Sequence, residues 1–286
     1  MHIFSRSRLT AVWAWALAFA VTALAGATWT GLLSLNLSTT PAIPWSVVVM
    51  GLLLWALYRY LGGAWAPHST SDARRRLLRA NRAPANVFGW AVAAGLLAIV
   101  ALAGLWVVLF HAAGLPSRVL PDYSRYPIFT VALAVVMAAL VNGVVEESLF
   151  RGYLQGILEG QVGGLVAIVI TAVVMSPEHS LTQGFVWPTI VFYLLVDFML
   201  GMSALLCQSI LPGIVTHSVG IFVFFTAVWP GDLLRQTFGQ GDATAWLWIH
   251  SGQALLFGAL SVLAYTRLAR LTQPSQTPMR RSIASA

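Results

Sequence analysis

Three ionisable side chains lie close together in the apolar stretch VNGVVEESLFRGYLQG (141–156), namely Glu146, Glu147 and Arg151. One charged side chain at the centre of a membrane helix costs about 3 kcal/mol on insertion scales, so three together indicate a function. On a helix, Glu147 and Arg151 are four residues apart and can pair on one face. Glu146 points about 100° away from Glu147 and needs a partner from another part of the chain.

Few polar residues in the other apolar stretches can be that partner: Glu178 and His179 in VVMSPEHSL, Asp197 in LLVDFMLG, and His217 in LPGIVTHSVG. Glu146 lies about 14 residues before a turn predicted near 159–162, and His179 about 17 residues after it. At the rise of an α-helix these separations are roughly 21 and 25 Å. We therefore expect both side chains at similar heights on neighbouring antiparallel helices. Pro177 is expected to break the second helix and to free backbone groups beside His179.

One glutamate and two histidines that meet inside a membrane would form a hydrolytic site. Glu146 can act as a general base that activates water. His179 and His217 can bind Zn²⁺ together with Glu146, or they can donate hydrogen bonds to an oxyanion without a metal. The residue types leave both mechanisms open. A structural ion pair explains Glu147 and Arg151 as well as a direct catalytic role does.

Two further acidic residues need an interpretation. Glu178 is expected at the membrane interface rather than in the site. Asp197 lies within an apolar span, where a carboxylate is costly. It is expected either to pair with Arg151 or to line the cavity of the site.

The composition places these residues in a membrane protein. Of the 286 residues, 58% are hydrophobic and only 9% are charged, and the mean hydropathy is +0.80. A soluble domain carries roughly 25% charged residues. Long unbroken apolar runs predict an all-α polytopic transmembrane helix bundle rather than a β-barrel. About eight spans are expected, at residues 9–35, 44–62, 87–113, 128–158, 162–179, 187–206, 210–229 and 244–268.

The spans are expected to form one bundle over residues 1–271, followed by a disordered cytoplasmic tail at 272–286. The motif-bearing core of the bundle is about 128–229. The polar stretch 69–86 is predicted to be a cytoplasmic loop with a short amphipathic helix. The first span looks somewhat like a signal peptide, but its apolar run is long for one, so a retained helix is favoured.

The basic residues predict the orientation of the bundle. All 16 are arginines, and the net charge is +7. With a cytoplasmic N-terminus, 12 arginines lie inside, 3 lie outside and Arg151 lies within a span. This bias predicts cytoplasmic N- and C-termini in a plasma membrane, and the loop arginines are expected to contact lipid headgroups. The chain has no separate basic domain, which argues against nucleic-acid binding. The use of arginine for every basic residue is typical of a GC-rich bacterial coding sequence.

The stretch EESLFRGYL (146–154) resembles the E-E-x-x-x-R signature of the CPBP (CAAX protease and bacteriocin-processing, or Abi) intramembrane proteases. The second motif of that family, Phe-x-x-x-His, corresponds to MSPEH, where His179 matches and Met175 replaces the aromatic residue. The third motif, His-x-x-x-Asn or Asp after a proline, corresponds to LPGIVTHSVGI. There His217 matches, while Ile221 stands in place of the amide or acid.

The resemblance covers the motif-bearing core and implies an all-helical membrane bundle with endopeptidase activity. The implied substrate is a membrane-associated or lipidated, CAAX-like peptide. By this resemblance Glu146 would activate water, and Glu147 would assist, oriented by Arg151. His179 and His217 would stabilise the oxyanion, or they would bind a metal together with Glu146.

Ile221 motivates an alternative function. Loss of one oxyanion donor costs about 10²–10³ in rate in other enzymes, so a catalytically weakened binding or immunity protein of the same fold remains open. A small transporter that uses the buried acids and histidines as a relay is a third possibility. The absence of visible internal repeats counts against it. The substrate, the cleavage position and the oligomeric state are not determined by the sequence.

Overall fold

The computed structural model describes three stretches of the chain, residues 3–115, 122–231 and 243–273, without the side chains of residues 3–9, 181–183 and 243. Every regular element in these stretches is a helix, which confirms the predicted all-α fold. Two expectations fall outside the described residues: the tail beyond Gln273, and the positions of Arg118 and Arg235.

Long helical segments in the described residues correspond to the predicted spans, with ends that differ by a few residues. They are α1 (Ile3–Thr39), α2 (Trp45–Leu61), α4 (Ala85–Ala112), α5 (Ile128–Glu146) continued by η2 (Glu147–Leu154) and α6 (Gln155–Val162), α7 (Gly164–Gln183), α8 (Trp187–Cys207), α9 (Leu211–Val223) continued by η3 (Phe224–Val228), and α11 (Ala243–Thr272). Six of these segments are long and apolar enough to cross a membrane, and α2 and α7 are shorter apolar helices. The protein is therefore an integral membrane protein with a polytopic helical bundle.

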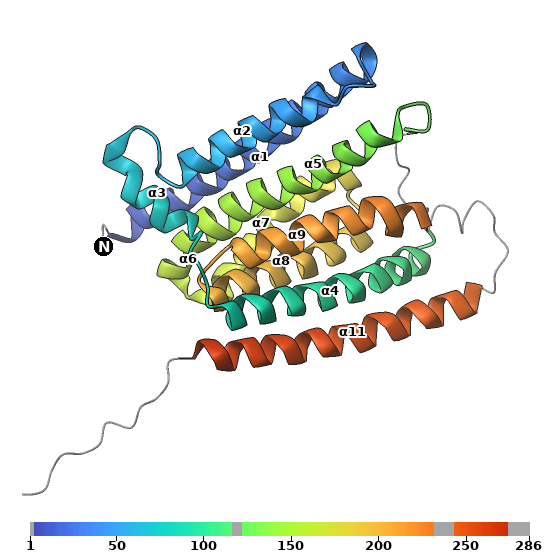
Figure 1. The fold of residues 1–286 in the computed structure, drawn as a ribbon. Helices are drawn as coiled ribbons and strands as arrows, with labels where there is room; N and C mark the ends of the chain where they lie inside the picture. Colours follow the sequence, from blue (N-terminus) through green and yellow to red (C-terminus); the bar gives the residue numbers. More distant parts are fainter. Residues whose placement is uncertain (1–2, 116–121, 232–242, 274–286) are drawn as a thin grey trace, which may run out of the picture.

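The helices lie side by side with the site-bearing elements in the interior (Figure 1). α1 and α2 cover α5 on one side of the bundle, and α11 packs along α4 on the other. Between these outer layers, α9 contacts α5, α4 and α8, and α8 contacts α7. α8 and α9 each pack one face against other helices, and that face can carry polar side chains away from lipid.

One end of the bundle gathers the segments that carry most of the described arginines. The start of α1, the short helix α3 (Ser71–Leu78) and the end of α11 all lie at this end, on the left of Figure 1. Arg74 lies in α3, and Arg270 lies in the last turn of α11. The predicted orientation requires this arrangement, and a cytoplasmic location of this end stays a prediction.

The loop that contains α3 is anchored to the helix that bears the two glutamates. α3 is the short helix predicted in this loop, and it ends at Arg79, whose φ of 55° is left-handed. The Arg79 guanidinium pairs with Glu159 of α6 at 2.9 Å and donates to the Ala204 carbonyl of α8 at 3.1 Å. Gly152 permits the close approach of α3 to η2, because a Cβ there would lie 2.8 Å from the Leu78 carbonyl oxygen. These contacts hold η2 in place from the side of the loop that contains α3.

The expected helix break at Pro177 is wrong. α7 continues through Pro177 and ends at Gln183. Proline removes one backbone hydrogen bond, but a membrane offers no water to the freed groups, so the helix is retained where it packs along α8. Three residues before the proline, the indole of Trp15 donates to the Val174 carbonyl at 3.1 Å. His179 is therefore presented from a continuous helix rather than from a broken end.

Candidate active site

The helix that carries the two glutamates changes its hydrogen-bonding pattern at the site. α5 ends at Glu146, and the eight residues Glu147–Leu154 form the π-helix η2 before α-helical geometry resumes in α6. π-Helical turns are rare and often occur at functional sites. The prediction that this segment is α-helical is therefore wrong between Glu147 and Leu154. The predicted ion pair still forms, with 3.7 Å between Glu147 Oε1 and Arg151 Nε.

His217 of α9 lies between the two glutamates. Its Nδ1 hydrogen-bonds Glu147 Oε1 at 3.0 Å, and its Nε2 lies 3.8 Å from Glu146 Oε2. The second distance is too long for a direct hydrogen bond. Glu146 is 7% exposed to solvent, whereas Glu147 is fully buried. His217 of α9 is thus close to Glu146 without a direct hydrogen bond, and the two adjacent carboxylates have different surroundings.

Arg151 is completely buried between carboxylates from two helices. Besides its contact with Glu147, its Nη2 donates to Asp197 Oδ1 of α8 at 2.5 Å. Its Nη1 lies against the sulfur of Met175, the residue that replaces the aromatic of the second motif. The expected pairing of Asp197 with Arg151 is confirmed. Because a buried guanidinium requires opposite charge, this contact ties α8 to η2.

His179 reaches the site from α7 and contacts α8. Its Nε2 lies 3.5 Å from Asp197 Oδ2. Its ring stacks on Tyr193, with ring centroids 4.0 Å apart and planes inclined by 11°. The site residues thus form two groups that the Glu147–Arg151 pair joins: Glu146, Glu147 and His217 in the first, and Arg151, Asp197, His179 and Tyr193 in the second.

Glu178 stands next to His179 on α7 and takes part in none of the ion pairs described above for the two groups. Its side chain is half-buried, and its Oε2 is buried without a hydrogen bond among the described residues. Its predicted position at the membrane interface stays a prediction.

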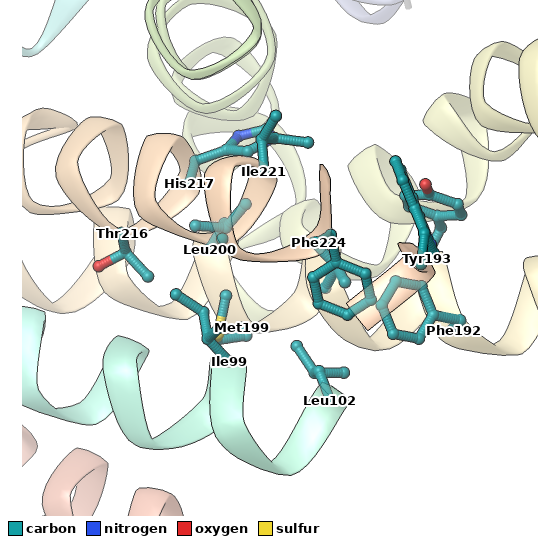
Figure 2. Close-up of a pocket in the computed structure, with 13 residues that line it drawn as sticks. Ile99, Leu102, Phe192, Tyr193, Met199, Leu200, Thr216, His217, Ile221 and Phe224 are labelled. Atoms are coloured by element: carbon teal, nitrogen blue, oxygen red, sulfur yellow. The ribbon is translucent and has the colours of Figure 1, made fainter. Parts of the chain in front are cut away.

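A small apolar cavity of about 50 Å³ reaches His217 from the side of α4 and α8. Figure 2 shows Ile221 beside His217 on α9, with Ile99 and Leu102 of α4 on another wall. Phe224 also lines the cavity, at the start of η3. Ile221 is thus a wall residue of an apolar cavity, and its side chain has no hydrogen bond to offer to a reacting group.

The three possible metal ligands are not gathered around one point. Glu146 and His217 are close, but Nε2 of His179 faces Asp197. Among the residues that the structure describes, no group of three or more His, Cys, Asp or Glu side chains is arranged to hold a metal ion. The arrangement therefore does not fit a Zn²⁺ site of two histidines and one glutamate. The predicted Zn²⁺ stays a prediction, which measurement of bound metal would test.

Gly213 allows Glu147 to lie against the N-terminal end of α9. A Cβ at this position would lie 2.5 Å from Glu147 Oε2. The positive end of a helix dipole favours a carboxylate at such a position. The glycine follows Pro212, which occupies the first turn of α9.

Two residues of this arrangement, Tyr193 and Gly213, were not identified from the sequence. Tyr193 lies four residues before Asp197 in an apolar helix, a spacing that places both on one face. Gly213 follows the proline of the third motif directly. These two spacings could have drawn attention to Tyr193 and Gly213 in the sequence. Neither spacing shows that Tyr193 contacts His179 or that Gly213 contacts Glu147.

Comparison with known proteins supports the motif assignment. Residues 127–223 match the family model described as Rce1-like, type II CAAX prenyl endopeptidase. The matched residues contain all five predicted site residues and overlap most of the predicted motif-bearing core. No curated protein and no solved structure matches the chain.

Proposed function

On the premise that residues 127–223 form an Rce1-like domain of the CPBP type, we propose that this protein is an intramembrane endopeptidase that hydrolyses a peptide bond in a membrane-associated or lipidated peptide. The observation that carries the proposal is the pair formed by Glu146 and His217. Glu146 Oε2 and His217 Nε2 face each other across 3.8 Å inside the bundle. A water molecule beside both atoms can hydrogen-bond to each of them.

The difference in burial assigns the roles of the two glutamates. Glu146 retains some exposure, so it acts as the general base that takes a proton from the attacking water. Glu147 is fully buried and is held by Arg151 and His217. Its role is to accept a hydrogen bond from His217 Nδ1 and so to direct Nε2 toward the reacting atoms.

The two histidines stabilise the tetrahedral intermediate. As the water attacks, negative charge develops on the former carbonyl oxygen, and N–H donors fixed near that oxygen lower the barrier. In the doubly protonated form, each ring keeps one N–H on its carboxylate partner, Glu147 for His217 and Asp197 for His179. The other N–H of each ring is the donor to the oxyanion, from α9 and α7. The proton taken by Glu146 then passes to the leaving amine, which completes the hydrolysis.

The cavity beside His217 supports an apolar substrate group. Its lining includes Ile221, Phe224 and Leu102, and it opens next to the proposed reaction centre. A small apolar group of the substrate would bury its surface there, at about 25 cal/mol per Å². The match to the CAAX prenyl endopeptidase model supports a lipidated, CAAX-like peptide as the proposed substrate class.

The test of this function is cleavage of quenched fluorescent peptides by the purified full chain in nanodiscs. A farnesylated peptide and the same peptide without the lipid are compared, with and without a chelator. The proposal predicts faster cleavage of the lipidated peptide and a rate that the chelator does not change. Loss of activity on chelation, together with bound Zn²⁺ in the sample, would replace the metal-free mechanism. If neither peptide is cleaved, the result would favour the alternative that the protein binds a partner without hydrolysing it.

Ile221 favours that alternative and supplies its own test. Because isoleucine offers no donor, Ile221→Asn is expected to raise the cleavage rate by up to about 10²-fold if the native site lacks one oxyanion donor. The rate is measured with the same lipidated peptide. An unchanged rate would show that the position is dispensable in this chain.

Gly213→Ala is expected to displace Glu147 or α9, because the added Cβ would overlap the carboxylate. Overpacking of this kind costs about 1–3 kcal/mol, and the cleavage rate should fall with it. Thermal unfolding in detergent and peptide cleavage measure the two effects. Gly258→Ala on α11 is the matched control, since its Cβ would meet only Ala101 Cβ at 4.0 Å. A Gly213→Ala variant as active and stable as this control would contradict the close approach.

A further inference from the structure

We propose that α8 contributes Tyr193 and Asp197 to the site as positioning residues that hold the ring of His179 in its working orientation. The inference rests on the proposed function and extends it to a helix that carries none of the three motifs. It also gives a role to the carboxylate of Asp197, a costly group within a membrane span.

The two contacts restrain different motions of the imidazole ring. Stacking on Tyr193, at 4.0 Å and 11°, sets the plane of the ring. The Asp197 carboxylate, 3.5 Å from Nε2, sets the rotation of the ring within that plane. Both α8 side chains are buried, and the second carboxylate oxygen of Asp197 is held by Arg151. A chain of contacts therefore runs from Arg151 through Asp197 to His179.

The sequence of α7 explains why α8 must provide this support. Met175 replaces the aromatic residue that precedes the motif histidine by four positions, and its sulfur contacts Arg151. The aromatic surface that His179 contacts comes instead from Tyr193. Ile221 adds no donor at the site, so the orientation of the two histidines carries more of the stabilisation of the oxyanion.

A competing interpretation is that Asp197 only neutralises Arg151. The two interpretations differ in whether Asp197 acts through His179, and a double-variant cycle separates them. If Asp197 positions His179, its removal has little further effect once the imidazole is absent. If Asp197 only supports Arg151, its removal has the same effect with or without His179.

The kinetic experiment uses the full chain in nanodiscs and the lipidated peptide. Asp197→Asn is expected to lower kcat by about 10²-fold or more with KM nearly unchanged, because an orienting carboxylate acts on the chemical step. Asp197→Glu should recover part of kcat. In the His179→Ala background, Asp197→Asn should lower kcat by less than about threefold. An equal loss in both backgrounds would overturn the positioning role.

Two substitutions of Tyr193 test the stacking contact. Tyr193→Phe keeps the aromatic face and should retain kcat, whereas Tyr193→Leu should lower it. Phe110→Leu is the matched control, because Phe110 is a buried aromatic of the same cluster that stacks on Trp106. It should lose stability without a change in kcat. Equal activity of Tyr193→Leu and Phe110→Leu would show that stacking on His179 has no role.

A spectroscopic readout keeps the inference testable without any cleavage. The chain has six histidines, so ¹⁵N-histidine labelling gives few signals, and His179→Gln assigns the one of interest. One proton of His179 is expected on Nε2, facing Asp197, with the other on Nδ1, and Asp197→Asn should shift the signals of both ring nitrogens. Unchanged His179 signals in Asp197→Asn would refute the contact. If the wild-type chain cleaves no peptide, the proposed function fails, and this measurement still decides the positioning of His179.

Discussion

Glu146→Gln is expected to lower kcat for peptide cleavage by about 10²–10⁴-fold, the usual contribution of a general base. Glutamine has the same shape as glutamate but cannot take a proton from water. The fold should be retained, because Glu147 rather than Glu146 forms the ion pair with Arg151. Cleavage of the lipidated peptide and thermal unfolding of the same sample measure activity and stability separately.

The controls for this variant use other carboxylates of the chain. Asp72→Asn removes an exposed carboxylate of α3, so it should leave both cleavage and unfolding unchanged. Glu147→Gln keeps the general base and should lower kcat less than Glu146→Gln does, while destabilising the fold more. Full turnover of Glu146→Gln would end the assignment of this residue as the base. A larger catalytic loss in Glu147→Gln than in Glu146→Gln would reverse the two roles.

Arg151→Met is expected to destabilise the protein by about 3–5 kcal/mol, enough to abolish folding of a marginally stable bundle. Methionine fills much of the volume but leaves the buried carboxylates of Glu147 and Asp197 without a countercharge. The yield of monodisperse protein and the midpoint of thermal unfolding report the effect. Arg75→Met is the matched control, because Arg75 is exposed and lies 3.8 Å from the exposed Asp72. Such surface pairs contribute little, so the control should behave as wild type.

A compensated variant distinguishes loss of charge balance from loss of packing. Adding Glu147→Gln and Asp197→Asn to Arg151→Met removes all three charges, so folding should return while cleavage stays absent. If the triple variant is as unstable as Arg151→Met, the guanidinium acts through its packing and hydrogen bonds rather than through its charge. If Arg151→Met alone folds and cleaves normally, the buried network has no essential role.

The helices and their order are predictable from the sequence because they depend on local composition. A bilayer requires about 20 apolar residues to cross it as a helix, and the apolar runs of this chain are separated by polar or arginine-bearing loops. The candidate residues Glu146, Glu147 and Arg151 are equally visible, because a charge in an apolar run is costly wherever the helix lies. His179 and His217 are visible as polar residues of other apolar runs, and the motif resemblance supports their place in the same site.

Local geometry was less predictable. The π-helix at Glu147–Leu154 is not encoded in a residue pattern that differs from an α-helix. α7 continues through Pro177 because its packing and the absence of water favour a complete helix. In both places the surroundings, rather than the propensity of the segment, determined the backbone.

The apolar runs and the few charges within them are enough to predict a helical membrane bundle whose ionisable residues need partners. The identity of those partners depends on how the helices pack. His217 contacts Glu147, while His179 contacts Asp197 and Tyr193. The physical reason is that spacing along a helix sets which face a side chain occupies, whereas a contact between helices depends on their rotation and depth. Those are set by packing over the whole bundle, at close approaches such as that of Gly213 to Glu147.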